Sequence, residues 1–173
     1  DLERDTLCDK WKCEGSPSID GPHGGCSGGT AVAVNAHIGI TAPRMPCGIE
    51  SNPHNLYEVV PGHLSAVVVN GWILSRFLAI SVYMDVNYKF RVKHRAILLA
   101  MGMLIAANAL LFVAMGDWNN TPQELASSGW LETFDGYIIA PDTPTCCTSL
   151  AKQGRIIVYA VTSKWITPLV EYV

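Results

Sequence analysis

The sequence has few charged side chains, no excess of basic residues, and none of the short motifs that mark common enzyme sites. Charged residues make up 16% of the chain, whereas ordinary soluble domains carry about 25%. A formal net charge of -3 provides no basic field, so nucleic acid is not an expected partner. The sequence has neither a glycine-rich phosphate loop nor a C-x-x-C pair. We therefore predict no catalytic group, no metal site and no enzyme.

What the sequence has in quantity is apolar residues. They form 49% of the 173 residues, and the mean hydropathy is +0.23. A chain of this length suits one domain, and this composition favours a membrane protein. Asp1 opens the chain without a basic and apolar leader, which indicates a processed, mature protein. The predicted fold class is a mainly α membrane protein.

The strongest membrane signal is the run 96–115. Its only polar side chain is Asn108. As a helix the run would be about 30 Å long, which matches the hydrocarbon core of a bilayer. We expect a second apolar helix here, either spanning the membrane or re-entering it.

The run 58–84 is predicted to be the first transmembrane helix. Because Arg76 lies inside it, the favoured register spans about 58–75, with Arg76 at one headgroup layer and Trp72 near the interface. Pro61 would then lie in the first turn, where its missing N–H breaks no helical bond.

The linker 85–95 and the N-terminal segment carry opposite charge. The linker holds Lys89, Arg91, Lys93 and Arg95 against one acidic residue, whereas residues 1–60 hold four basic and eight acidic residues. The positive-inside rule therefore places 85–95 on the side of insertion and the N-terminal domain, 1–57, on the translocated side.

The N-terminal cysteines agree with an oxidising compartment. Cys8, Cys13, Cys26 and Cys47 all lie in the translocated segment, which fits one or two disulfides. Four cysteines allow three full pairings, and the sequence does not choose between them. A zinc site is the weaker alternative, because no C-x2-C pair is present.

The C-terminal part, 116–173, is predicted to be a short helix followed by an irregular tail. Thr121, Pro122 and Glu124 have the pattern of a helix N-terminus with a capping box, so a helix is expected over 122–134. The last stretch, 155–173, is rich in β-branched and aromatic residues and contains Lys164 and Pro168, which makes it a poor spanning helix.

Taken in order, these features resemble subunit III of photosystem I (PsaF). The resemblance covers about residues 1–80 and rests on the following residues: Cys8 in DLERDTLC, Cys47-Gly48 followed after four residues by Pro53-His54, Glu58, Pro61, Gly71-Trp72 and Arg76. Glu58 followed by His63, and 125–137, loosely resemble another photosystem I subunit (PsaL), which leaves the cysteines unexplained.

The resemblance implies a Cys8–Cys47 disulfide, with Cys13–Cys26 as a possible second one. It implies bound chlorophyll a and carotenoid, with His63 and Trp72 as possible pigment contacts. Its expected partners are photosystem I core subunits and antenna proteins. Lys10 and Lys12 are candidates for docking plastocyanin or a soluble c-type cytochrome, although the acidic N-terminal segment gives that role little support.

The resulting hypothesis is a non-catalytic photosystem I subunit of the chloroplast thylakoid membrane, with its N-terminal segment in the lumen. It would support electron-donor docking and contact between core and antenna. Two alternatives remain open: an accessory subunit of another membrane complex, and a small membrane thiol-disulfide oxidoreductase that uses Cys146 and Cys147.

Overall fold

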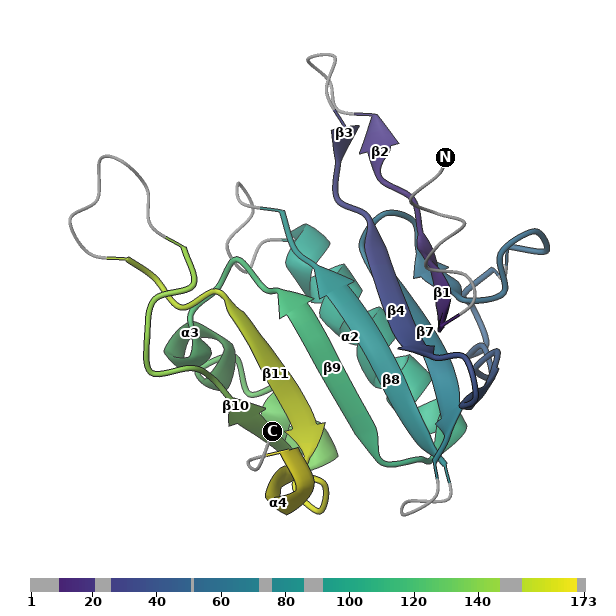
Figure 1. Ribbon diagram of the computed structural model, residues 1–173. Helices are drawn as coiled ribbons and strands as arrows, with labels where there is room; N and C mark the ends of the chain where they lie inside the picture. The colour runs from purple at the N-terminus through teal and green to yellow at the C-terminus, as the bar shows by residue number, and fades with distance from the viewer. Residues whose placement is uncertain are drawn as a thin grey trace.

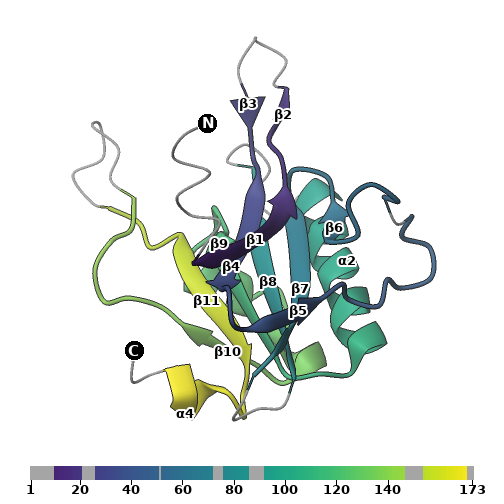
Figure 2. The same cartoon turned by 45° about the vertical axis from the view of Figure 1, so that its right-hand side comes forward.

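A large mixed β-sheet dominates the computed structural model, with a helix on one face and a small β-sheet on the other (Figure 1). The structure describes residues 10–20, 26–50, 52–71, 76–85, 92–146 and 154–170. Figure 2 shows the small sheet and α2 on opposite sides of the strands β7 and β8. The predicted mainly α membrane fold is therefore wrong.

The large sheet has seven strands in the order β10-β11-β9-β8-β7-β5, with β6 paired to β7. Its neighbouring strands are antiparallel except for β8 and β9, which run parallel. The bounds are β5 Gly39–Thr41, β6 Glu58–Val60, β7 Leu64–Asn70, β8 Phe77–Tyr83, β9 Phe112–Asp117, β10 Gly136–Ile139 and β11 Val158–Ser163. The helix α2, Val92–Asn108, connects the parallel pair.

The run 58–84 forms strands instead of a transmembrane helix. It contains β6, β7 and β8, and every residue of β7 except Asn70 is buried. A strand covered on both faces has no polar side to alternate with its apolar side, so it reads as one continuous apolar run. Arg76 lies exposed just before β8.

The run 96–115 is divided between a helix and a strand. The helix α2 ends at Asn108, the backbone turns at Ala109 with φ 49°, and β9 follows. Asn108 stabilises this end because its side-chain amide donates to the carbonyl oxygens of Leu104 at 2.8 Å and Arg44 at 3.0 Å. No helix in the described residues is long and apolar enough to cross a membrane.

The N-terminal segment forms the small sheet. Strands β1, Trp11–Ser16, and β4, Thr30–Asn35, pair antiparallel, and a short hairpin of β2, Ile19–Asp20, and β3, Cys26–Ser27, extends from them. Ser16 joins the two layers: its hydroxyl donates to buried Glu58 and accepts the N–H of Gly62 at 2.6 Å. This part of the chain is a layer of the sandwich.

The C-terminal part contains one confirmed local prediction and one failure. Thr121 caps α3, Pro122–Ala126, and Glu124 completes the capping box. The expected helix over 122–134 stops at Ala126, and a 3-10 turn, η1, follows over Leu131–Phe134. The tail is not irregular, because β11 inserts between β10 and β9 and α4, Thr167–Val170, follows it.

Candidate active site at the carboxyl ends of β8 and β9

The parallel strands β8 and β9 bring two polar segments to one edge of the large sheet. Their register pairs Val82 with Gly116 and Tyr83 with Asp117. The Met84 N–H extends the pairing by donating to the Asp117 carbonyl oxygen at 2.8 Å. In open α/β sheets, ligands bind outside the carboxyl ends of parallel strands. This edge is therefore the candidate functional site.

Strand alternation places two polar side chains on one face at this edge. Val82, Met84 and Ala114 are buried in the core together with residues of α2. Because successive side chains of a strand point to opposite faces, Tyr83 and Asp117 project to the face away from α2, and Asp85 follows just after the end of β8. The small sheet lies on that same side of β8 (Figure 2).

Asp117 is a carboxylate whose pKa is altered by its surroundings. It is half-buried at the end of β9, and the backbone N–H of Asn119 donates to its Oδ1 at 3.0 Å. Burial raises the pKa of this carboxyl group, and the smaller effect of the hydrogen bonds from Asn119 lowers it. A carboxylate with a raised pKa is a better proton acceptor and marks a functional site more often than an ordinary one.

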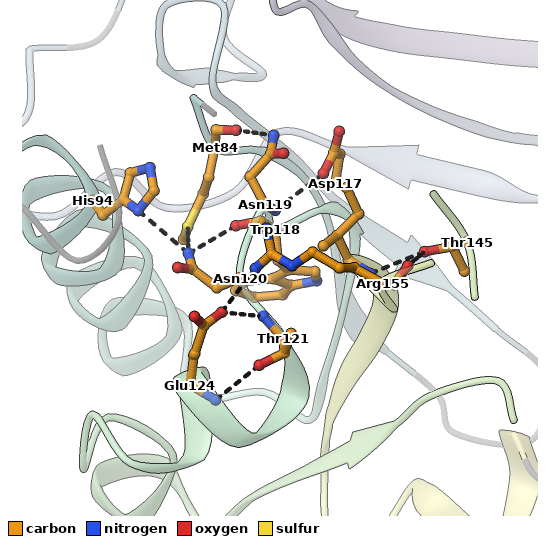
Figure 3. A network of polar contacts seen from close by, with 11 residues as sticks. Met84, His94, Asp117, Trp118, Asn119, Asn120, Thr121, Glu124, Thr145 and Arg155 are labelled. Carbon is orange, nitrogen blue, oxygen red and sulfur yellow. Dashed lines mark hydrogen bonds and ion pairs between the residues drawn. The ribbon is translucent and has the colours of Figure 1, made fainter. Parts of the chain in front are cut away.

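Asn119 ties the loop after β9 to the end of β8. Its backbone adopts the left-handed conformation, with φ 48°, which asparagine tolerates better than most residues. This turn directs the side-chain amide toward β8, where it donates to the Met84 carbonyl oxygen (Figure 3). Asn119 therefore binds the Asp117 carboxylate through its backbone N–H and the Met84 carbonyl oxygen through its side-chain amide.

Asn120 and His94 join the same edge to α2. The fully buried Asn120 amide donates to the Trp118 carbonyl oxygen at 2.8 Å and lies 3.3 Å from His94 Nδ1 (Figure 3). His94 Nε2 lies 2.9 Å from the backbone oxygen of Asp85. Because a carbonyl oxygen only accepts, Nε2 carries the proton and Nδ1 accepts from Asn120. Burial lowers the pKa of His94, which agrees with this neutral ring.

Asp85 and His63 complete the polar edge. Asp85 Oδ2 accepts from Lys93 Nζ at 2.5 Å and lies 3.9 Å from His63 Nε2. His63 Nδ1 is 3.0 Å from the Tyr83 carbonyl oxygen, and the two rings stack with centroids 5.9 Å apart. The Tyr83 hydroxyl is 3.4 Å from the hydroxyl of Ser27 on β3, in the strand pair that extends from the small sheet. Both layers of the sandwich therefore contribute to this edge.

The acidic side chains raise the question of a bound metal. Within the described ranges, no three His, Cys, Asp or Glu side chains lie close enough together to hold one. Asp85, moreover, is already paired with Lys93. We therefore derive no step through a metal ion.

Most residues singled out from the sequence lie away from this edge. Lys10 and Lys12 are exposed at the start of β1, and Lys12 Nζ donates to the Ile38 carbonyl oxygen at 3.2 Å. Trp72 lies outside the described residues. His63 lies at the edge, in a setting that the sequence did not indicate.

The structure describes three of the four N-terminal cysteines. Cys13, Cys26 and Cys47 have exposed thiols that form no disulfide with another described residue. The Cys8–Cys47 disulfide stays a prediction, because Cys8 is not among the described residues. Cys8 and Cys147 lie outside the described residues, and Cys146 is a free thiol.

Sequence reasoning missed the candidate site residues after β9. The segment 116–120, Gly-Asp-Trp-Asn-Asn, belongs to the predicted short helix and tail of 116–173, and no candidate site residue was assigned to it. The available signal was an acidic residue and two amides directly after a buried segment. That signal has meaning only once the apolar run is known to end in a strand.

Comparisons by sequence with protein-family models and with curated proteins give no match. Comparison with solved structures gives several matches. An endonuclease/exonuclease/phosphatase family protein from Leptotrichia buccalis superimposes with a TM-score of 0.53 and 12% identity, over 90% of this chain and 61% of that one. This chain has the endonuclease/exonuclease/phosphatase fold.

Two further structures share the endonuclease/exonuclease/phosphatase fold with it. The endonuclease domain of TRAS1, a telomere-specific non-LTR retrotransposon, gives a TM-score of 0.60 at 13% identity, over 91% of this chain and 67% of that one. ANGEL2, a 2',3'-cyclic phosphatase, gives a TM-score of 0.56 at 12% identity, over 93% of this chain and 65% of that one. The chain thus spans about two thirds of the length of the structures it matches.

These findings correct the hypothesis drawn from the sequence. The structures that share this fold are named as an endonuclease domain, a 2',3'-cyclic phosphatase and an endonuclease/exonuclease/phosphatase family protein, so the resemblance to photosystem I subunits and the non-catalytic role that it implied are wrong. The thylakoid location, the lumenal segment and the photosystem, antenna, plastocyanin and cytochrome partners lose their basis, since no described helix could span a membrane. Chlorophyll and carotenoid were implied only by that resemblance, which no longer supports them.

Proposed function

We propose that this protein hydrolyses phosphoester bonds at the carboxyl ends of β8 and β9. The observation that carries the proposal is Asp117, a half-buried carboxylate with a raised pKa at the edge where open α/β sheets bind ligands. The activities named for proteins of the same fold, an endonuclease and a 2',3'-cyclic phosphatase, support phosphoester chemistry.

In the proposed reaction Asp117 acts as the proton acceptor. One proton of a water molecule passes to its carboxylate, and the water oxygen forms a bond to phosphorus. The ester P–O bond breaks, and the leaving alcohol takes a proton from solvent. The raised pKa of Asp117 favours this role, since proton transfer is most efficient when the pKa of the acceptor approaches the working pH.

The neighbouring residues would hold Asp117 in position. The Asn119 N–H binds one carboxylate oxygen, and the Asn119 side chain is anchored on Met84. Rotation of the carboxylate is therefore restricted by a loop that is itself tied to the adjacent strand. Such preorganisation is what lets a general base act without first being ordered.

We propose phosphodiesters of nucleic acids and nucleotides as the substrate class. An endonuclease cleaves a phosphodiester, and a 2',3'-cyclic phosphate is one as well. The negative net charge of the chain does not exclude such substrates, because a basic side chain, Lys93, lies at the candidate site, where its Nζ contacts the Asp85 carboxylate. Local charge at a site decides binding there more than the total charge does.

The test is a hydrolysis assay of the purified chain in water enriched with oxygen-18. The substrates are labelled single-stranded and duplex oligonucleotides and adenosine 2',3'-cyclic phosphate, each with Mg²⁺, with Mn²⁺ and with a chelator. The proposal predicts cleavage of at least one substrate with one heavy oxygen in the phosphate product. Intact substrates under every condition would contradict it.

A further inference from the structure

His63 is buried at the candidate site with a nitrogen that has no hydrogen-bond partner. The residue is 3% exposed, and Nε2 has no partner among the residues that the structure describes. Leaving a buried polar atom unpaired costs roughly 1–3 kcal/mol. A buried histidine so placed calls for a physical explanation.

The hydrogen bond at Nδ1 determines what Nε2 can do. Nδ1 lies 3.0 Å from the Tyr83 carbonyl oxygen, which only accepts, so the ring proton is on Nδ1. In the neutral ring, Nε2 then carries a lone pair. The Asp85 carboxylate lies near that nitrogen, with Oδ2 3.9 Å from Nε2.

Two acceptors at this spacing need a donor between them. The distance of 3.9 Å is too long for a direct hydrogen bond and short enough for one water molecule to bridge. A water that donates one hydrogen to Nε2 and one to Oδ2 satisfies both atoms. The surroundings are polar, because Lys93 Nζ contacts the same carboxylate oxygen.

We propose that His63 is a positioning residue of the active site: through a bridging water, its Nε2 fixes the Asp85 carboxylate at the carboxyl end of β8. This inference rests on the proposed function. The ring also stacks on Tyr83, and the Tyr83 N–H donates to the His63 carbonyl oxygen at 2.9 Å. His63 therefore joins the turn before β7, the end of β8 and the acidic edge.

Three substitutions separate the ways in which His63 could act. His63→Asn keeps an amide near the position of Nδ1 and removes Nε2. His63→Phe keeps a ring for stacking and removes both nitrogens. His63→Gln places an amide near the position of Nε2. The exposed His54 provides a matched control as His54→Asn.

The experiment measures kcat and KM on the best phosphodiester substrate, together with thermal unfolding. A misplacement of about 1 Å in a site can cost about 100-fold in rate. We expect His63→Asn and His63→Phe to lose kcat by up to about that factor with little change in KM. His63→Gln should recover most of the loss, and His54→Asn should match wild type. Wild-type kcat in His63→Asn or His63→Phe would overturn the proposal.

Nitrogen-15 NMR of the histidine rings tests the same proposal without activity. We expect His63 to be the Nδ1–H tautomer, with a hydrogen-bonded Nε2 whose resonance shifts in Asp85→Asn. An Nε2–H tautomer, or a resonance unaffected by Asp85→Asn, would overturn it. Failure of the proposed function has a different signature, since wild type and His54→Asn would both be inactive while the NMR result stood.

Discussion

Gly116 on β9 packs so closely against Val82 on β8 that a Cβ atom at position 116 would overlap the Val82 carbonyl oxygen. Its φ of 154° is also one that side chains rarely adopt. The close approach directly precedes Asp117, so it fixes where the proposed proton acceptor leaves the sheet.

Gly116→Ala should therefore destabilise the protein by at least about 3 kcal/mol, because a backbone contact has no room to relax. Gly129→Ala is the matched control. Gly129 has φ 74° with open space around its Cβ position, so only the backbone penalty of about 1 kcal/mol applies. Urea unfolding of both variants measures the difference. Equal losses would show that the β8–β9 contact is not tight.

Asp117→Asn should raise thermal stability at neutral pH. Burial raises the folded-state pKa of Asp117, so the folded protein favours the protonated form, and stability falls as pH rises through that pKa. An uncharged amide removes this penalty. We expect the Tm to rise by about 2 °C at pH 7.5, and the gain to vanish well below the unfolded value of 3.8, where aspartate is protonated in both states. A lower Tm at pH 7.5 would contradict the burial argument.

His94 should make stability depend on pH below neutrality. Its folded-state pKa is lowered by burial, so stability is complete above the unfolded value of 6.5 and is lost as pH falls through and below it. His94→Leu should remove this dependence and cost about 2 kcal/mol at pH 7.5, since Asn120 and the Asp85 carbonyl lose a partner. Urea unfolding at pH 7.5 and 5.5 tests both points, with exposed His54→Leu as control. An unchanged pH dependence in His94→Leu would show that another group is responsible.

Tyr159→Phe should be neutral or stabilising by up to about 1 kcal/mol. The Tyr159 hydroxyl is buried without a hydrogen-bond partner among the described residues, and burial raises its pKa strongly. Its ring stacks on Trp118 at 5.4 Å with an interplanar angle of 10°, a contact that phenylalanine keeps. Chemical denaturation measures the change, and a loss above about 1 kcal/mol would mean that the hydroxyl has a partner.

Local chemistry was predictable from the sequence where it depends on adjacent residues. The capping box of Thr121 and Glu124 is such a case, because both hydrogen bonds close within four residues. The end of α3 was not predicted, since the turn at 127–130 depends on how Trp130 packs, with its indole N–H donating to the Leu98 carbonyl oxygen at 2.9 Å.

The fold class was predicted wrongly because the large sheet contains a strand, β7, that is covered on both faces. A strand buried on both faces and a membrane helix give the same apolar run, and β7 is such a strand. One signal did distinguish them. Asn70-Gly71 is a typical turn pair between apolar strands, and β7 ends at Asn70. Between the end of α2 at Asn108 and the start of β9 at Phe112 there is no glycine or proline. Asn108 was therefore the only sequence signal of this boundary.

The candidate site depends on contacts between segments that are distant in the sequence. Asn119 reaches Met84, and His63 reaches Tyr83, over 35 and 20 residues respectively. Each of these residues has an ordinary interpretation in isolation. They acquire a common role only through the parallel register of β8 and β9, which no local pattern encodes.

The most direct test of the proposed function compares the phosphodiesterase kcat of Asp117→Asn with that of Asp142→Asn. Asp142 is an exposed carboxylate on the loop after β10, so its variant controls for the loss of a charge. Because general base catalysis contributes about 10²- to 10⁴-fold, we expect Asp117→Asn to lose at least 100-fold while Asp142→Asn retains wild-type activity. Activity in Asp117→Asn within a few-fold of wild type would contradict the assignment of this edge as the active site.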